Sequence, residues 1–381
     1  AGSTGNSVHT ATGAGTFTSP AGATSADILV VAGGGGGGGN DTNGEGAGGA
    51  GGGGIVHHAT YTLVGAIEYD LTVGAGGTAG GDSHPRDGGN GGNSSFNDNA
   101  EGSQAKMTAI GGGGGSAVEG IDGGSGGGPG RAFTGAGEST QTDSGGGTGY
   151  GNDSGAGDGS WGTSGAGGGG ASGVGTSGPN ATTGGDGGAG RLFSDFTTWG
   201  VSGYFGGGGG GGGNGTRGPA GSGGGGRGGD NDSGDPGVAN TGGGGGGAND
   251  VNTGSVGGSG TVIIKYTVTG AANDMTLISN ATTAVDGAPT TGDLVITYTD
   301  GVGTATVNTD IKAYISRNGS AYTSAVTLVS QGTTGGHTIL TANGVDLSGI
   351  TTGTSMRWKI ETLNQGVSKE TRIQAVSLGW S

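Results

Sequence analysis

Runs of consecutive glycine constrain this chain more than any other feature of its sequence. The segment ADILVVAGGGGGGGN (26–40) passes from a hydrophobic stretch directly into seven glycines. Glycine loses more backbone entropy on ordering than any other residue, and it brings no side chain to bury. A folded region built from such runs therefore needs a source of stability other than a side-chain core. The runs are Gly33–Gly39, Gly51–Gly54, Gly111–Gly115, Gly167–Gly170, Gly206–Gly213, Gly223–Gly226 and Gly242–Gly247.

The distribution of glycine divides the chain into two parts. Of the 112 glycines in 381 residues, 93 lie between residues 32 and 260. Glycine makes up about two-fifths of that region, whereas the usual level is roughly 7%. The composition returns to normal after Gly260. We therefore expect a glycine-rich domain over residues 1–267 and a second domain over residues 270–381.

Charge follows the same division. The formal net charge is −16, and residues 1–260 hold 6 Lys and Arg against 21 Asp and Glu. Nucleic acids and anionic membrane surfaces bind through clustered cations, so neither is an expected partner. The longest apolar runs are far too short to span a membrane, so no membrane insertion is expected. The chain has no cysteine, which excludes disulfides.

Three interpretations of the glycine runs compete. Disorder is the default for glycine-rich tracts. Collagen needs glycine at every third position and abundant proline, whereas this chain has seven prolines and no sustained triplet. The third interpretation is a bundle of extended threefold helices, polyglycine II, whose N–H and C=O groups point outward and bond to neighbouring helices. The similar lengths of the runs favour the bundle.

Good strand sequences bracket the glycine-rich region. We expect strands within 8–31, within 55–73 and at 261–268, where β-branched residues are frequent. The strand before the first glycine run is expected to pair with TVIIKY (261–266) and so close the domain. No stretch of the first 260 residues shows helical periodicity.

The second part of the chain predicts an antiparallel β-sandwich. Short segments with strand composition alternate with turn residues, and Ile311, Ala313 and Ile315 point away from Lys312 and Tyr314. The expected strands are 275–279, 293–299, 310–317, 325–329, 337–340, 355–361 and 371–378. The predicted fold class is thus all-β and irregular: a polyglycine II bundle bracketed by strands, followed by an antiparallel β-sandwich.

The chain resembles phage tail-fibre and tail-tip proteins. The resemblance rests on VHTATGAGTFTSPAGATSADILVVAGGGGGGG, YDLTVGAGG, KMTAIGGGGG and GGSGTVIIKY, within residues 8–267. The segments around 293–319 and 353–381 look like the β-domain that ends some of these proteins. The resemblance implies packed polyglycine helices, with the loops between the runs as the surface that touches the host.

This resemblance implies a structural and host-recognition component of a phage tail, located in the virion tail outside the cell. The implied partners are other tail proteins and a host cell-surface glycan or outer-membrane protein, and the implied assembly is a homotrimer. One alternative is a bacterial surface adhesin or extracellular filament subunit. A second alternative is an ice-binding polyglycine bundle. We expect no enzymatic activity, no cofactor and no metal.

Aromatic residues between the glycine runs are the candidate receptor-binding residues. Rings beside Asp and Asn suit sugar faces and binding hot spots. The competing interpretation is structural, because the same rings could bury one end of the bundle or pack on the neighbouring domain. The candidates are Arg191, Phe193, Phe196, Trp199, Tyr204, Phe205, Tyr150 and Trp161.

Other motifs are weaker. Gly123–Gly127 matches the G-x-S-x-G pattern, but glycine density produces this by chance and no strand–turn–helix context surrounds it. His57 and His58 are adjacent in an expected strand, so their rings should point to opposite faces. The Asp- and Asn-rich segments 151–159 and 228–235 fit neither the G-G-x-G-x-D nonapeptide repeat nor an EF-hand loop, and solvated turns are the expected interpretation.

Overall fold

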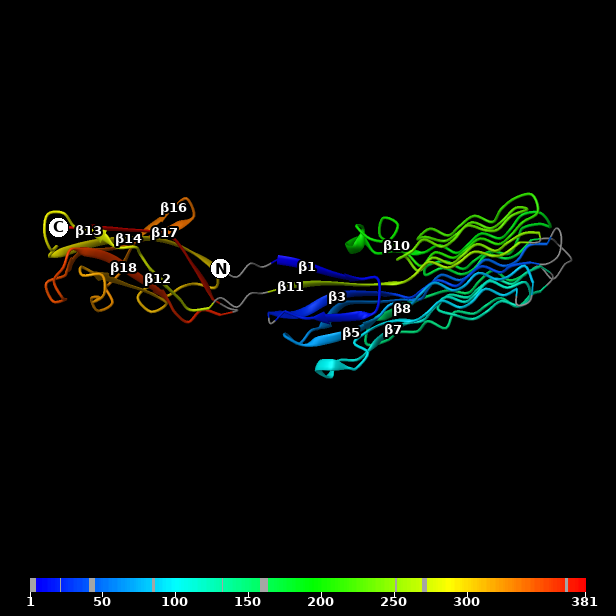
Figure 1. Cartoon of the computed structure of the whole chain (residues 1–381), viewed down its shortest axis with the longest axis horizontal. Helices are drawn as coiled ribbons and strands as arrows, with labels where there is room; N and C mark the ends of the chain where they lie inside the picture. The colour runs from blue at the N-terminus through cyan, green and yellow to red at the C-terminus, as the bar shows by residue number, and fades with distance from the viewer. Residues whose placement is uncertain are drawn as a thin grey trace. The chain divides into compact units, whose positions relative to one another are not determined.

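The fold is described from a computed structural model of the chain. It describes residues 5–20, 22–40, 45–83, 86–131, 133–157, 164–250, 252–268, 273–366 and 369–381. The chain divides into two compact units, one formed by residues 6–267 and the other by residues 268–381 with the first five residues (Figure 1). We call them the glycine unit and the sandwich unit. Both are built from strands and irregular segments, as the sequence predicts.

The glycine unit begins as two facing sheets. The core between them holds apolar side chains from both, including Ile28, Val30, Tyr69 and Phe96. The five-stranded sheet has the order β1 (Gly5–Ala11), β11 (Thr261–Val268), β3 (Ala23–Val31), β4 (Ile55–Thr62), β8 (Thr148–Tyr150). The four-stranded sheet has the order β2 (Gly15–Thr18), β5 (Glu68–Thr72), β6 (Ser94–Phe96), β7 (Met107–Ala109). A single 3₁₀ turn, η1 (Glu101–Ser103), joins β6 to β7.

The first and last strands of the glycine-rich region meet as expected. Strand β11 hydrogen-bonds to β3 in the five-stranded sheet, although their sequences lie more than 200 residues apart. The run ILVV in β3 is buried on both faces of the sheet: Ile28 and Val30 enter the core between the sheets, while Leu29 and Val31 face the opposite side. The expected closure of the domain by these strands is confirmed.

The glycine run after β3 is an ordered rod with threefold symmetry. The N–H groups of Gly33, Gly36 and Gly39 donate to the carbonyls of Gly92, Gly89 and Arg86, at 3.0, 2.9 and 2.8 Å. Successive hydrogen bonds between the two rods are thus three residues apart on both of them. This spacing is the signature of the polyglycine II helix, which has three residues per turn and no internal hydrogen bonds. The bundle interpretation is confirmed for this run.

The same rod is surrounded by six others. Its remaining N–H groups donate to two further segments, and its carbonyls accept from three more, each again at intervals of three residues. Rods in the bundle therefore pack side by side, and Figure 1 shows them running together away from the sheets. The six neighbours of 33–40 are 48–54, 77–80, 86–92, 112–115, 245–248 and 252–258.

Close approach makes glycine obligatory in this rod. A Cβ added to Gly35 or Gly36 would lie closer than 3.0 Å to the carbonyl oxygen of Gly113 or Thr78. The obstructing atoms are backbone, which cannot move without displacing another rod and its hydrogen bonds. Backbone pairing, and not side-chain packing, holds the bundle together.

Outer rods follow a pattern that the sequence did not reveal. In the segment 254–260, Gly254, Gly257 and Gly260 face inward, while Val256 is 52% exposed. Glycine recurs at every third position on the inward side of this rod, and Gly258 is also required, because an added Cβ would lie closer than 3.0 Å to the carbonyl oxygen of Val238. The remaining positions, Ser255, Val256 and Ser259, carry side chains. These rods have no long glycine run and were not recognised from composition.

The sandwich unit consists of two antiparallel sheets with a side-chain core. Leu294, Ile296, Ile311, Ile315 and Ile360 are fully buried in it. One sheet has the order β16 (Val329–Thr334), β17 (His337–Asp346), β14 (Thr291–Val302), β19 (Glu370–Trp380). In the other, β18 (Ser355–Thr362) pairs with β12 (Met275–Ile278), β13 (Thr282–Thr283) and β15 (Ile311–Ser316). The predicted β-sandwich is confirmed.

One expected strand of the sandwich is wrong. Residues 325–328 form no strand, and β16 begins only at Val329. The side chain of Asn308 explains the difference, because its Oδ1 accepts from the N–H of Leu328 at 2.7 Å and its Nδ2 donates to the carbonyl of Leu328 at 3.0 Å. The N–H of Val326 still donates to the carbonyl of Ala313 in β15 at 2.9 Å, but at Leu328 a side chain takes the place of a neighbouring strand.

Helices long and apolar enough to cross a membrane are not found in the described part of the chain.

Candidate binding surfaces

The aromatic segment 191–205 folds into a small cap. Strands β9 (Arg191–Leu192) and β10 (Tyr204–Phe205) pair as a hairpin, with the 3₁₀ turn η2 (Ser194–Phe196) between them. The cap covers the face of the five-stranded sheet that points away from the core described above. Its buried rings pack on four apolar side chains of that sheet, Leu29, Val31, Ile55 and Ile263.

Burial separates the candidate residues into two groups. Phe196 and Phe205 are fully buried and Phe193 is 7% exposed, so these three rings chiefly stabilise the cap and are not exposed contact residues. Their expected role as contact residues is corrected on this point: the apolar outer face of the sheet requires them as cover. Four candidates remain partly exposed, namely Tyr150, Arg191, Trp199 and Tyr204.

A small pocket opens beside the exposed group. It encloses about 210 Å³ and is lined by residues of β4, β8 and the cap, among them His57, Tyr150, Arg191 and Asp195. The Cζ of Arg191 lies 3.9 Å from the centroid of the Tyr150 ring, a close cation–π contact. The side chain of Asp27 fixes the His57 ring, because Asp27 Oδ1 lies 2.7 Å from His57 Nε2.

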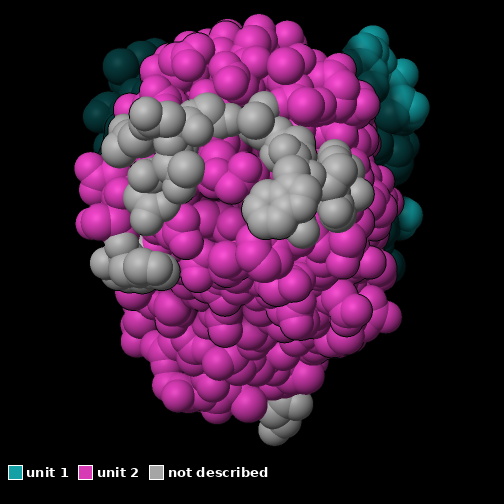
Figure 2. Space-filling view, turned by 90° about the vertical axis from the view of Figure 1, so that its right-hand side faces the viewer, with its two compact units in different colours: residues 1–5, 268–381 teal, residues 6–267 magenta. Residues whose placement is uncertain are grey.

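The other end of the rods carries a second candidate surface. Here the rods turn back on one another, and isolated bridges join Asn40 to Asn252, Gly46 to Asn249 and Thr183 to Thr216. Residues from distant parts of the sequence therefore lie side by side. We call this surface the loop end and define it as residues 40, 45–46, 180–183, 214–217, 230–233, 249–250 and 252–253. Figure 2 looks onto this end of the glycine unit.

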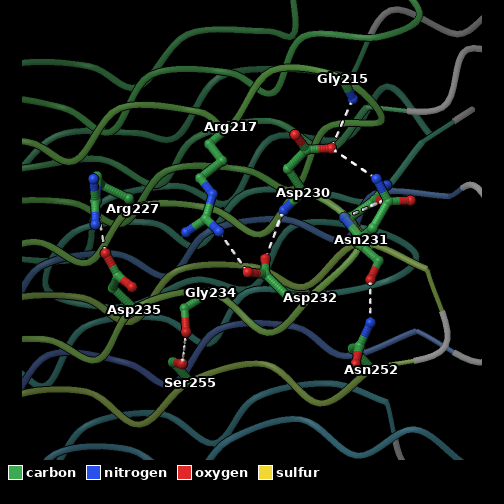
Figure 3. A network of polar contacts seen from close by, with 11 residues as sticks. Gly215, Arg217, Arg227, Asp230, Asn231, Asp232, Gly234, Asp235, Asn252 and Ser255 are labelled. Atoms are coloured by element: carbon green, nitrogen blue, oxygen red, sulfur yellow. Dashed lines mark hydrogen bonds and ion pairs between the residues drawn. The ribbon is translucent and has the colours of Figure 1, made fainter.

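Polar side chains fix the turns of the loop end (Figure 3). Asp230 Oδ1 accepts from the N–H of Gly215 at 2.9 Å, and Asp232 Oδ1 accepts from the N–H of Asp230 at 2.8 Å. The other carboxylate oxygen of Asp232 pairs with Arg217. Asn231, between the two aspartates, adopts a φ of 56°, the left-handed conformation that Asn tolerates in tight turns.

The network continues across the loop end. Asn249 is fully buried; its Oδ1 accepts from the N–H of Asn231 at 3.2 Å and its Nδ2 donates to the carbonyl of Glu45 at 2.9 Å. The carboxylate of Glu45 pairs with Arg131. These residues were not singled out from the sequence as binding residues, although the Asp- and Asn-rich spacer at 228–235 marks one of the turns.

The remaining residues singled out from the sequence can each be placed against the structure. Trp161 lies outside the described residues. The His57 and His58 rings point to opposite faces of β4, toward Phe193 and Tyr61 respectively, as expected for neighbours on a strand. Ser125 of the G-x-S-x-G match is fully buried inside a rod, so its hydroxyl is not presented to solvent.

The aspartates of segment 228–235 are used in the turns and in ion pairs. Besides the contacts of Asp230 and Asp232, Asp235 Oδ2 lies 2.7 Å from Nε of Arg227. Within the described ranges, no group of three acidic or histidine side chains converges as metal ligands would.

The fold and these two surfaces define a class of protein: a scaffold of polyglycine II rods closed by sheets at one end and by polar turns at the other. Residues 10–267 match the family described as the glycine-rich domain, and the chain belongs to that family. No curated protein matches the chain.

Proposed function

We propose that the chain is a structural and host-recognition component of a phage tail, a tail fibre or tail-tip adhesin, and that the loop end contacts a host cell-surface glycan or outer-membrane protein. It would act outside the cell, in the virion tail, as a binding protein without catalysis. The homotrimer and the other tail proteins remain partners implied by the sequence resemblance.

One observation supports this proposal above the others. The loop end brings turns from distant parts of the chain to one surface, and polar contacts hold their backbones. Thr182 and Thr216 are exposed there, on a frame whose backbone is already ordered. A preorganised surface loses little entropy on binding, which is what recognition by exposed loops requires.

Cell binding tests the loop end. Thr216 is exposed and its side chain makes no hydrogen bond in the described structure, so Thr216→Arg adds bulk and charge without removing a structural contact. Val174→Arg is the matched control, because Val174 is 57% exposed on the segment between Ser172 and Thr176, away from the loop end.

Labelled protein is incubated with a panel of intact bacterial cells, and bound protein is counted by flow cytometry. We expect at least tenfold weaker binding by Thr216→Arg to any strain that binds the original chain, and unchanged binding by Val174→Arg. Equal binding by Thr216→Arg and the original chain would place the contact elsewhere.

Two simple measurements separate the alternatives. Electron microscopy of the assembled protein shows discrete appendages for a tail component and continuous fibres for an extracellular filament subunit. A thermal-hysteresis assay gives no activity unless the chain binds ice.

A further inference from the structure

We propose that the pocket around Arg191 binds the carboxylate of an acidic sugar residue, of the uronic acid class. This site lies on the aromatic cap and does not depend on the role of the loop end. The argument starts from a cation whose hydrogen-bond donors are unused.

Arg191 differs from other cations of the glycine unit in having no carboxylate partner. The glycine unit is strongly acidic, and Lys106, Arg217 and Arg227 each pair with a carboxylate. The guanidinium of Arg191 makes no ion pair and no hydrogen bond to any of the residues that the structure describes. An unpaired guanidinium is unusual in a unit with such an excess of carboxylates.

The aromatic contact keeps the guanidinium available. The ring of Tyr150 faces the cation at 3.9 Å, and Phe193 lies 5.9 Å away on the same pocket wall. A ring that stacks on the face of a guanidinium uses none of its N–H donors, which lie in the plane of the group. Arg191 therefore lies in the pocket lining with its N–H donors unused, and such a fork of donors can bind a carboxylate in a bidentate pair.

The rest of the pocket fits a sugar ring better than a bare anion. Asp195 and Ser194 are exposed in its lining and accept hydrogen bonds from hydroxyl groups. Leu192 is 47% exposed beside them and offers an apolar surface to the C–H face of a sugar. The volume of about 210 Å³ is below the roughly 300 Å³ of pockets for drug-sized ligands, a size that suits a single sugar residue.

Charge excludes a polyphosphate at this site. Phosphate polymers bind through clustered cations, which neutralise several phosphates together. The pocket lining holds Arg191 with one carboxylate, Asp195, while the ammonium of Lys265 nearby donates to the carbonyl of Asp195 at 2.8 Å. Arg191 is the one Lys or Arg in the described lining, and it lies beside groups that accept hydrogen bonds from hydroxyls; this set matches one carboxylate on each sugar ring.

Titration with monosaccharides tests the proposal on the full chain. Glucuronic acid is the probe, glucose is the neutral sugar of the same shape, and acetate is the bare carboxylate; binding is followed by NMR shifts of the Tyr150 and Trp199 rings. We expect millimolar binding of glucuronate that is at least tenfold tighter than that of glucose or acetate.

Variants then assign the binding to Arg191. Arg191→Met should weaken glucuronate binding at least tenfold, and Arg191→Lys, which keeps the charge but not the fork, should weaken it less. Arg227→Met is the matched control, since Arg227 is 62% exposed and paired with Asp235, and it should bind as the original chain does.

Equal affinity of Arg191→Met and the original chain would overturn the proposal. Equal affinity for glucuronate and glucose would also overturn it, because the carboxylate would then contribute nothing to binding. Acetate binding as tightly as glucuronate would overturn it too, because the sugar ring would then contribute nothing to binding. Near-ultraviolet circular dichroism of each variant shows whether the cap is folded. If Arg191→Met does not fold, the comparison is made with Arg191→Lys instead.

Discussion

The two units of this chain reach a stable interior by opposite routes. In the sandwich unit, fully buried side chains such as Ile296 and Ile360 fill the space between sheets. In the bundle of the glycine unit, the interior of the rod 33–39 contains no side chain, and its backbone N–H groups bond to neighbouring rods at 2.7–3.1 Å. A sandwich core therefore fails when atoms are removed from it, whereas the bundle fails when atoms are added.

The largest expected effect is the addition of one methyl group to a central rod. Gly36→Ala places a Cβ against the backbone of Thr78, and we expect a loss of more than about 5 kcal/mol in the free energy of unfolding, an exceptional value for one substitution. Thermal unfolding followed by circular dichroism measures it. Gly13→Ala is the control, because no atom lies within 4 Å of its added Cβ; similar stability of the two variants would contradict a backbone-packed core.

The aromatic cap should respond as a side-chain core does. Phe196→Ala removes a fully buried ring from the outer face of the sheet, and we expect a loss of about 3–5 kcal/mol in the free energy of unfolding. Chemical denaturation measures the loss, with Thr198→Ala on the exposed side of the cap as the control. An unchanged midpoint would mean that the cap does not contribute to the stability of the glycine unit.

Acid should weaken the sandwich unit through Asp310. Burial raises the pKa of this carboxyl, but hydrogen bonds from Lys369, from the N–H of Thr306 and from Asn364 outweigh it and lower the pKa to about 2. Because the pKa is lower in the folded state, the stabilisation is complete above the unfolded value of 3.8 and is lost as the pH falls from there toward 2.

This contribution amounts to up to about 2 kcal/mol. Urea denaturation of the original chain and of Asp310→Asn between pH 5 and pH 2 measures it. The difference in stability between the two should shrink as the pH falls. A constant difference would show that Asp310 does not titrate differently in the folded and unfolded states.

The smallest effect is expected on the outer face of a peripheral rod. Val256 is 52% exposed, so Val256→Ser should change the free energy of unfolding by no more than about 0.5 kcal/mol. Its neighbour Gly257 faces inward, and Gly257→Ala brings a Cβ close to the carbonyl of Gly34. Thermal unfolding of the two variants should differ widely; equal losses would contradict the threefold register.

The long glycine runs and the bracketing strands carried enough information to predict the bundle and its closure. Gly33–Gly39 can be recognised because a rod with six neighbours needs glycine at every position. The peripheral rod 254–260 cannot be recognised in the same way, since one inward position in three is too weak a pattern in a region already rich in glycine.

The candidate binding residues were predicted less completely, and for a physical reason. The presence of aromatic residues in a segment does not reveal whether they are needed to bury an apolar face of a sheet. The buried state of Phe193, Phe196 and Phe205 follows from Leu29 and Val31, which make β3 apolar on its second face. The four consecutive apolar residues ILVV were the sequence signal that both faces of this strand are buried. The contacts that join turns at the loop end link residues up to about 200 positions apart, and composition does not reveal such pairs.

The rods also determine how the stability of the glycine unit depends on temperature. Exposure of apolar surface raises the heat capacity on unfolding, and exposure of polar surface lowers it. Unfolding of the bundle exposes mainly peptide groups, so its heat-capacity change per residue is smaller than that of a side-chain core. A smaller heat-capacity change gives a flatter stability curve, so we expect the stability of the scaffold that carries the loop end to vary less with temperature than that of a side-chain core.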